Sequence, residues 1–140
     1  MNKRIIITAS ILGILAVITG AFGAHGLSAE ISADQLNIWH TGVEYQFYHV
    51  FALLFLSTFT HFKNKLINVS YYFFTIGIIL FSGSLYLIAC SDLLKIKNAI
   101  PFIGPITPIG GTLFILGWLM LVIAAFMKED TGRKKKTRSA

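Results

Sequence analysis

The fold of this chain is decided by residues 5–24, which read IIITASILGILAVITGAFGA and contain no charged side chain. A transmembrane helix needs about 20 mostly apolar residues to cross roughly 30 Å of hydrocarbon, so this stretch is long enough to span a bilayer. Three further stretches meet the same requirement, and the four together take up more than half of the 140 residues: 43–62, 69–90 and 108–127. The sequence therefore predicts an all-α integral membrane protein, an antiparallel bundle of four transmembrane helices that form a single domain over residues 1–127.

The composition excludes other classes of protein. Hydrophobic residues make up 55% of the chain and charged residues 13%, and the mean hydropathy is +0.71. Soluble domains average about 45–50% apolar and about 25% charged residues, so neither a disordered chain nor an ordinary soluble domain fits these values. The single cysteine excludes a framework of disulfides within the chain.

The distribution of basic residues orients the helices. The net charge is +6, and ten of the twelve Lys and Arg residues lie on one side of the predicted topology: Lys3, Arg4, Lys63, Lys65, Lys128, Arg133, Lys134, Lys135, Lys136 and Arg138. The positive-inside rule places this side, with both termini, in the cytoplasm. A signal-peptide core is only about 7–15 residues long, so we expect the first helix to be retained. The basic tail, residues 128–140, is expected first to be an orienting signal. Attraction of anionic lipid headgroups is the alternative, and nucleic-acid binding is not expected.

Small residues predict how the helices pack. Apolar burial does not drive helix association inside lipid, whereas close approach at small side chains does. Glycines recur at helical spacing on three of the four predicted spans: Gly13, Gly20 and Gly23 on the first, Gly77 on the third, Gly110 and Gly117 on the fourth. These faces favour a tight bundle, and a face left on its outside would allow the chain to form a homo-oligomer.

Two boundaries have local signals. Ser32 and Gln35 have the spacing of a capping box, which predicts a helix start before the second span. Residues 33–42 then form either a helical extension of that span or a separate outer interfacial helix that bends at Gly42. Trp39 lies where an aromatic residue of the membrane interface is expected.

The stretch between the third and fourth spans contains all three prolines of the chain. Residues 100–108 are therefore predicted to be non-helical, either a loop that dips into the outer interface and caps the bundle or a plain surface linker. Thr107 followed by Pro108 predicts the N-cap and first residue of the last helix.

Ionisable residues in or beside a span are functional candidates. Six residues qualify, five of them expected near the outer mouth of the bundle and His49 deeper: His25, His40, Glu44, Tyr48, His49 and Asp92. His40, Glu44 and Tyr48 share one helix face, with His40 four residues before Glu44 and Tyr48 four residues after it. One hypothesis is a proton-exchanging or cation-binding vestibule. A second is a purely structural contact between helices, and a third, weaker one is a metal site from His25, His40 and Glu44. No cofactor is predicted, and no catalytic motif indicates an enzyme.

Several motifs together resemble one known family. They are GAFGAHGL at 20–27, WHTGVEYQFYH at 39–49, FSGSLYL at 81–87 and GPITPIGG at 104–111. From about residue 5 to residue 127 the chain resembles the small four-helix membrane proteins catalogued as domain of unknown function 423. This resemblance implies a four-helix protein of the plasma (inner) membrane of a bacterium and carries over no catalytic residue.

Three functions follow from the sequence as hypotheses. The first is an integral membrane protein that binds a small molecule, lipid or ion at its polar outer mouth. The second is a small proton-coupled transporter that works as an oligomer. The third is a non-catalytic accessory or assembly subunit. The expected partners are the lipid bilayer and either a second copy of the chain or another membrane protein.

Overall fold

The computed structural model describes residues 2–59 and 65–127, and within these residues every regular element is a helix. The elements, in chain order, are α1 (Lys3–Phe22), the π-helical turn η1 (Gly23–Leu27), α2 (Ala33–Ser57), α3 (Lys65–Ala89), the 3₁₀ turn η2 (Lys97–Ala99), α4 (Ile100–Ile103) and α5 (Ile106–Phe126). The end of the predicted second span, residues 60–62, and the basic tail, residues 128–140, lie outside the described residues.

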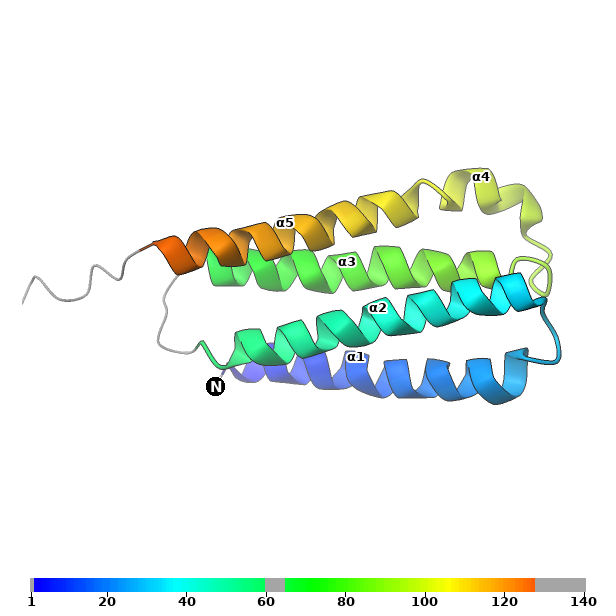
Figure 1. Ribbon diagram of the computed structural model, residues 1–140, viewed down its shortest axis with the longest axis horizontal. Helices are drawn as coiled ribbons and strands as arrows, with labels where there is room; N and C mark the ends of the chain where they lie inside the picture. The colour runs from blue at the N-terminus through cyan, green and yellow to red at the C-terminus, as the bar shows by residue number, and fades with distance from the viewer. Residues whose placement is uncertain (1, 60–64, 128–140) are drawn as a thin grey trace, which may run out of the picture.

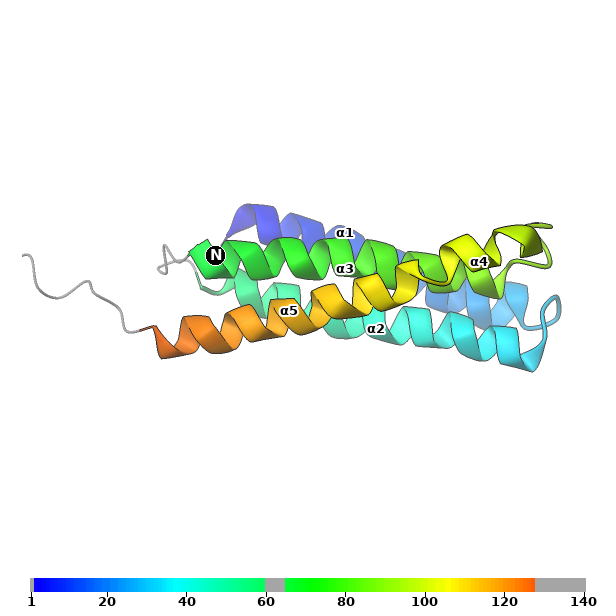
Figure 2. The same ribbon diagram turned by 90° about the horizontal axis from the view of Figure 1, so that it is seen from above.

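Four long helices lie side by side and alternate in direction, as Figures 1 and 2 show. The chief packing partners are α3 with α5, α2 with α3, and α1 with α2, so α2 and α3 form the inner pair of the bundle. One end, here called the α4 end, holds α4 and the connection from η1 to α2, and the N-terminus lies at the opposite end (Figure 1). The predicted all-α four-helix bundle is confirmed.

Three helical stretches are long and apolar enough to cross a membrane: Lys3–Leu27, Lys65–Ala89 and Lys97–Phe126. The remaining long helix, α2, has the same length as α3 but is more polar, because it carries two histidines, two acidic residues and two glutamines. These polar residues lie on both the buried and the exposed sides of α2.

The α1–α2 interface is close because glycines of α1 face α2. Methyl groups built at Gly13 and Gly20 would lie 3.4 and 3.5 Å from valine side chains of α2, and one at Gly23 would lie 2.6 Å from the Trp39 ring. Trp39 is 6% exposed. The missing side chain at Gly23 leaves room for the indole inside the bundle, so Trp39 packs against α1. Its placement at the level of the membrane interface stays a prediction.

The α3–α5 interface is tighter still. A methyl group at Gly110 would lie 2.5 Å from the backbone nitrogen of Phe81, and one at Gly77 would lie 2.7 Å from the Phe114 ring. Real Cβ contacts are not this short, so the two backbones approach as closely as they do only because glycine stands at these positions.

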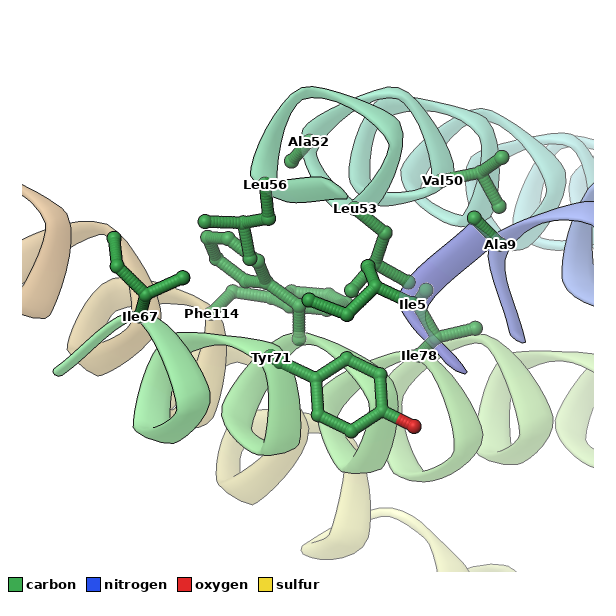
Figure 3. Packing of buried hydrophobic residues seen from close by; sticks show 11 residues of the cluster. Ile5, Ala9, Val50, Ala52, Leu53, Leu56, Ile67, Tyr71, Ile78 and Phe114 are labelled. Carbon is green, nitrogen blue, oxygen red and sulfur yellow. The ribbon is translucent and has the colours of Figure 1, made fainter. Parts of the chain in front are cut away.

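A continuous apolar core fills the half of the bundle away from α4, and Figure 3 shows side chains from α1, α2, α3 and α5 converging in it. Ile5, Leu53, Leu56 and Phe74 are fully buried there. A second, smaller cluster around Leu27 and Trp39 continues the packing toward the α4 end.

α2 begins where the capping-box pattern of Ser32 and Gln35 predicts a helix start. The Gln35 backbone N–H donates to Ser32 Oγ and the Ser32 backbone N–H donates to Gln35 Oε1, so the predicted capping box is confirmed. Residues 33–42 run without interruption into the rest of α2, which excludes the separate interfacial helix and leaves the extension. The helix also continues through Gly42, whose Cβ would lie 2.9 Å from the Tyr86 ring, so this glycine allows close packing against α3 and does not interrupt the helix.

The proline-containing connection is more helical than predicted. The expectation that residues 100–108 are non-helical is wrong, since α4 occupies Ile100–Ile103 and α5 begins at Ile106, with Pro105 as its N-cap. Pro101 and Pro108 both lie in the first turn of a helix, where the backbone N–H that proline lacks has no intrahelical partner. The prolines are therefore compatible with helix starts, and Thr107 does not cap α5.

Candidate functional site

The depth of α2 in the bundle is set by contacts at both of its ends. The backbone N–H of Asn2 donates to the carbonyl of Ser57 over 3.0 Å, and at the other end Trp39 packs on Gly23. Because α2 lies alongside α1 over this whole length, it crosses the membrane wherever α1 does.

This register places Glu44 at membrane depth. Its neighbour Val43 faces Gly20 of α1. The apolar stretch Lys3–Leu27 is about 37 Å long at 1.5 Å per residue, and Gly20 lies about 10 Å from its α4 end. If a hydrocarbon core of roughly 30 Å is centred on this stretch, the backbone of Glu44 lies about 8 Å inside it.

The side chain of Glu44 points away from the bundle. Glu44 is exposed, and Tyr48, one turn further along α2, is 57% exposed, whereas His40, one turn earlier, is half-buried. A charged side chain costs about 3 kcal/mol at the centre of a spanning helix on insertion scales, and less toward the interface, where Glu44 lies. The outside of α2 is therefore less favourable against lipid than a wholly apolar helix face.

Two regular rows of side chains run along α2. The buried row is spaced by four and three residues in turn and faces the other helices: Trp39, Val43, Gln46, Val50, Leu53 and Ser57. A second row with the same alternating spacing lies on the opposite side, and we call it the outward α2 face: Asn37, Thr41, Glu44, Tyr48, Phe51 and Phe55. Thr41 is half-buried and the other five are exposed. Alternating spacing of three and four is typical of a seam that packs against another helix.

The remaining polar candidates at the α4 end lie apart from this face. His25 is exposed on η1. Among the described residues no hydrogen bond or ion pair joins His25, His40 and Glu44, and no group of three His, Cys, Asp or Glu side chains is placed to hold a metal ion.

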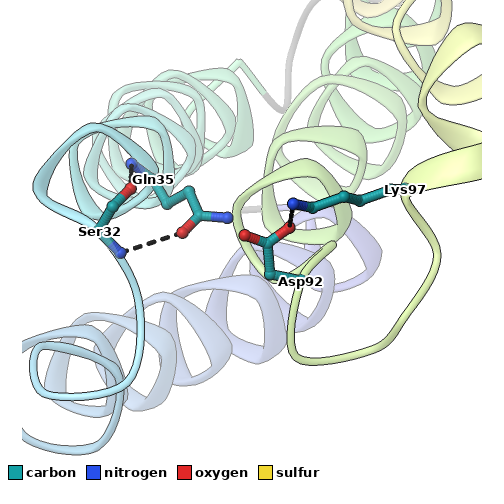
Figure 4. Close-up of polar contacts among 4 residues, drawn as sticks. All are labelled: Ser32, Gln35, Asp92 and Lys97. Carbon is teal, nitrogen blue, oxygen red and sulfur yellow. Dashed lines mark hydrogen bonds and ion pairs between the residues drawn. The ribbon is translucent and has the colours of Figure 1, made fainter.

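Asp92 belongs to the connection between α3 and α4. Its carboxylate accepts a hydrogen bond from the Lys97 ammonium over 2.8 Å, and the side chain of Gln35 lies beside it, as Figure 4 shows. The hydrogen bond from Lys97, aided by that from Gln35, lowers the pKa of Asp92 below its ordinary value of 3.8. An open hollow of about 410 Å³ lies here, lined by Asp92, Lys95, Lys97 and Asn98 and by no residue of α2. This site joins the start of α2 to the loop.

His49 lies in the interior, between α2 and α5. It is 5% exposed, and its ring stacks on Phe114 with the centroids 3.5 Å apart. Nδ1 lies 2.8 Å from the carbonyl oxygen of Tyr45, which can only accept, and Nε2 lies 3.4 Å from the indole N–H of Trp118. The two partners fit a neutral imidazole with its proton on Nδ1, held as a packed polar link between two helices.

A polar chain that sequence reasoning missed crosses the bundle nearby. The Tyr86 hydroxyl of α3 donates to Gln46 Oε1 over 2.8 Å, and Gln46 Nε2 donates to the Leu12 carbonyl of α1 over 2.8 Å. Thr19 Oγ1 lies 3.3 Å from the Tyr86 hydroxyl, and Trp39 Nε1 donates to the Thr19 carbonyl over 2.9 Å. The available signal was the position of Gln46 within the apolar row of α2, where a buried amide needs partners.

Comparisons with known proteins agree on one family. The family described as "Protein of unknown function (DUF423)" matches residues 19–111. A UPF0382 membrane protein of Staphylococcus aureus is 43% identical over 124 residues, covering 89% of this chain and 96% of its own. The UPF0382 membrane protein YwdK of Bacillus subtilis is 41% identical over 126 residues, 88% of this chain and 96% of its own. A UPF0382 membrane protein of Haemophilus influenzae is 40% identical over 130 residues, 93% of this chain and 99% of its own.

No solved structure matches the chain significantly. The relatives are named as bacterial membrane proteins, and the apolar helices described above agree with that name. The family resemblance seen in the sequence motifs is confirmed. This chain belongs to the DUF423 family of integral membrane proteins.

Proposed function

We propose that this protein is a non-enzymatic membrane subunit that assembles laterally with protein in the bilayer through the outward α2 face. One observation carries the proposal: Glu44 is exposed on the outside of the bundle at a depth where the neighbouring helix α1 presents apolar side chains. A protein partner would replace lipid around the carboxyl group and provide hydrogen-bond partners for it.

The arrangement of the candidates favours assembly over the other two hypotheses. A ligand-binding mouth or a proton pathway needs ionisable side chains around a shared interior space. Glu44 and Tyr48 point outward, Asp92 is engaged by Lys97, and His49 is enclosed between aromatic rings. Binding of a lipid or ion by the same α2 face is the competing function, and the experiment below separates the two.

The proposal also includes an orientation. Lys3, Arg4 and Lys65 are at the end of the bundle opposite α4. The positive-inside rule supports placing that end in the cytoplasm, so that Glu44 lies in the outer leaflet.

A photo-crosslinking experiment in bacterial membranes tests the proposal. The photoreactive amino acid p-benzoylphenylalanine replaces Tyr48, and in the control it replaces Ile14, which is 61% exposed against 57% for Tyr48. The two positions are at similar depth because Gly13 faces Val50. After irradiation we expect a discrete protein adduct from position 48 and only lipid adducts from position 14. Lipid adducts alone at both positions would refute assembly and favour lipid binding.

A further inference from the structure

The outward α2 face has the features of an interface between copies of this chain. Its row of side chains repeats the alternating spacing of the buried row on the other side of the same helix, which α2 uses to pack within the bundle. None of the ring contacts or hydrogen bonds described for this chain joins Glu44 to another helix. One side of α2 thus packs within the chain, and the opposite side has the same spacing with no partner helix among residues 2–59 and 65–127.

We propose that the outward α2 face pairs with the same face of a second copy in a two-fold symmetric dimer. This inference rests on the proposed lateral assembly and names its partner. All copies of a membrane protein share one topology, so the two α2 helices run parallel and the two-fold axis lies along the membrane normal. Residues of equal number then meet at equal depth.

This geometry brings acid and base together. Glu44 and His40 are one turn apart on α2, so across the two-fold axis the Glu44 carboxylate of one copy lies one turn from the His40 imidazole of the other, a spacing at which helical side chains interact. Two carboxylates and two imidazoles then share the interface, and each carboxylate has a histidine of either copy within its reach. The face is therefore complementary to itself, which a two-fold interface requires.

The rest of the face suits the same pairing. Tyr48, Phe51 and Phe55 continue the row below Glu44 and are 57%, 61% and 56% exposed. In a parallel dimer these rings would meet their counterparts across the axis, and aromatic pairs associate favourably in edge-to-face or offset contact. Asn37 and Glu44, as polar positions in a helix seam, would set the register of the two helices.

The test uses two differently tagged full-length copies expressed together at low level. One copy carries p-benzoylphenylalanine at position 48, or at position 14 as the depth-matched control, and the other copy carries no photoprobe. The expected result is an adduct that bears both tags, at twice the 15.5 kDa of one chain, from position 48 and not from position 14. Replacing Glu44 by Leu is expected to lower the yield about tenfold, the effect of losing one polar contact between membrane helices.

Each of the other outcomes contradicts one part of the proposal: the second copy as partner, the lateral assembly, or the α2 face as the interface. A discrete adduct from position 48 with another membrane protein, and none with both tags, overturns the second copy as partner and leaves the lateral assembly standing. Lipid adducts alone overturn both. Equal double-tagged yields from positions 14 and 48 overturn the specific face. The adduct yield of Glu44→Leu is compared with that of the unchanged chain only if the two unfold at the same temperature. The difference in double-tagged yield between positions 48 and 14 tests the dimer even without this variant.

Discussion

The contact of α5 with α3 at Gly110 makes a sharp prediction about stability. A methyl group at Gly110 would lie 2.5 Å from the backbone nitrogen and 2.8 Å from the Cα of Phe81, whereas one at the adjacent Gly111 would lie 3.7 Å from the Phe81 ring. The first is a collision with main-chain atoms of another helix, which cannot rotate away. The second is an ordinary van der Waals contact.

The pair of variants separates packing from helix propensity. Gly→Ala at an interior helix position is favourable by about 1 kcal/mol, and this gain is common to Gly110→Ala and Gly111→Ala. Overpacking of a tight interface costs about 1–3 kcal/mol. We therefore expect Gly111→Ala to be neutral or slightly stabilising and Gly110→Ala to unfold with a free energy about 1–3 kcal/mol lower than that of Gly111→Ala.

The assay is reversible unfolding in mixed detergent micelles, with increasing dodecyl sulfate and helix content followed by circular dichroism. The unchanged chain and both variants are measured in the same lipid-to-detergent ratio. Equal free energies of unfolding for Gly110→Ala and Gly111→Ala would show that α5 does not approach the α3 backbone this closely. Glycine at position 110 would then not be required for the packing of α3 against α5.

Three further predictions concern buried and loop residues. Gln46→Leu removes the amide that joins three helices, so the free energy of unfolding in the same assay should fall by about 1–2 kcal/mol; no loss would show that the bonds are not formed. Ser82 Oγ is buried without a partner, so Ser82→Ala should be neutral or stabilising, while Ser70→Ala, which loses a 3.0 Å bond to α5, should destabilise by about 0.6 kcal/mol; the reverse order of the two variants would contradict this. The lowered pKa of Asp92 implies that its bond to Lys97 contributes fully above the ordinary carboxyl value of 3.8 and is lost as the pH falls below it. Asp92→Asn should therefore lower the melting temperature slightly at neutral pH and not at all at the lowest pH, and an equal effect at every pH would exclude the ion pair as its cause.

Local signals allowed parts of this structure to be predicted, and long-range contacts explain the parts that were not. The capping box of Ser32 and Gln35 involves neighbouring residues only, so its pattern was sufficient. The prolines at 101 and 108 were misjudged because a proline that excludes a helix interior is acceptable in the first turn, where both of them lie.

The candidate site, too, could be predicted from the sequence only in part. Helical periodicity was enough to place His40, Glu44 and Tyr48 on one face of one helix. It did not indicate whether that face points into the bundle, because both sides of α2 carry polar and aromatic residues at the same spacing. His49 and Gln46 were equally ambiguous until their partners on other helices were known.

The sequence by itself determined the class of protein and its four long helices. Four uncharged or nearly uncharged stretches of spanning length leave no other way to satisfy the backbone in lipid. Only the tertiary structure decided which side of α2 the glycines of α1 contact. That choice follows from steric fit: Gly13, Gly20 and Gly23 accept Val50, Val43 and Trp39, so the opposite side, with Glu44, is left facing outward.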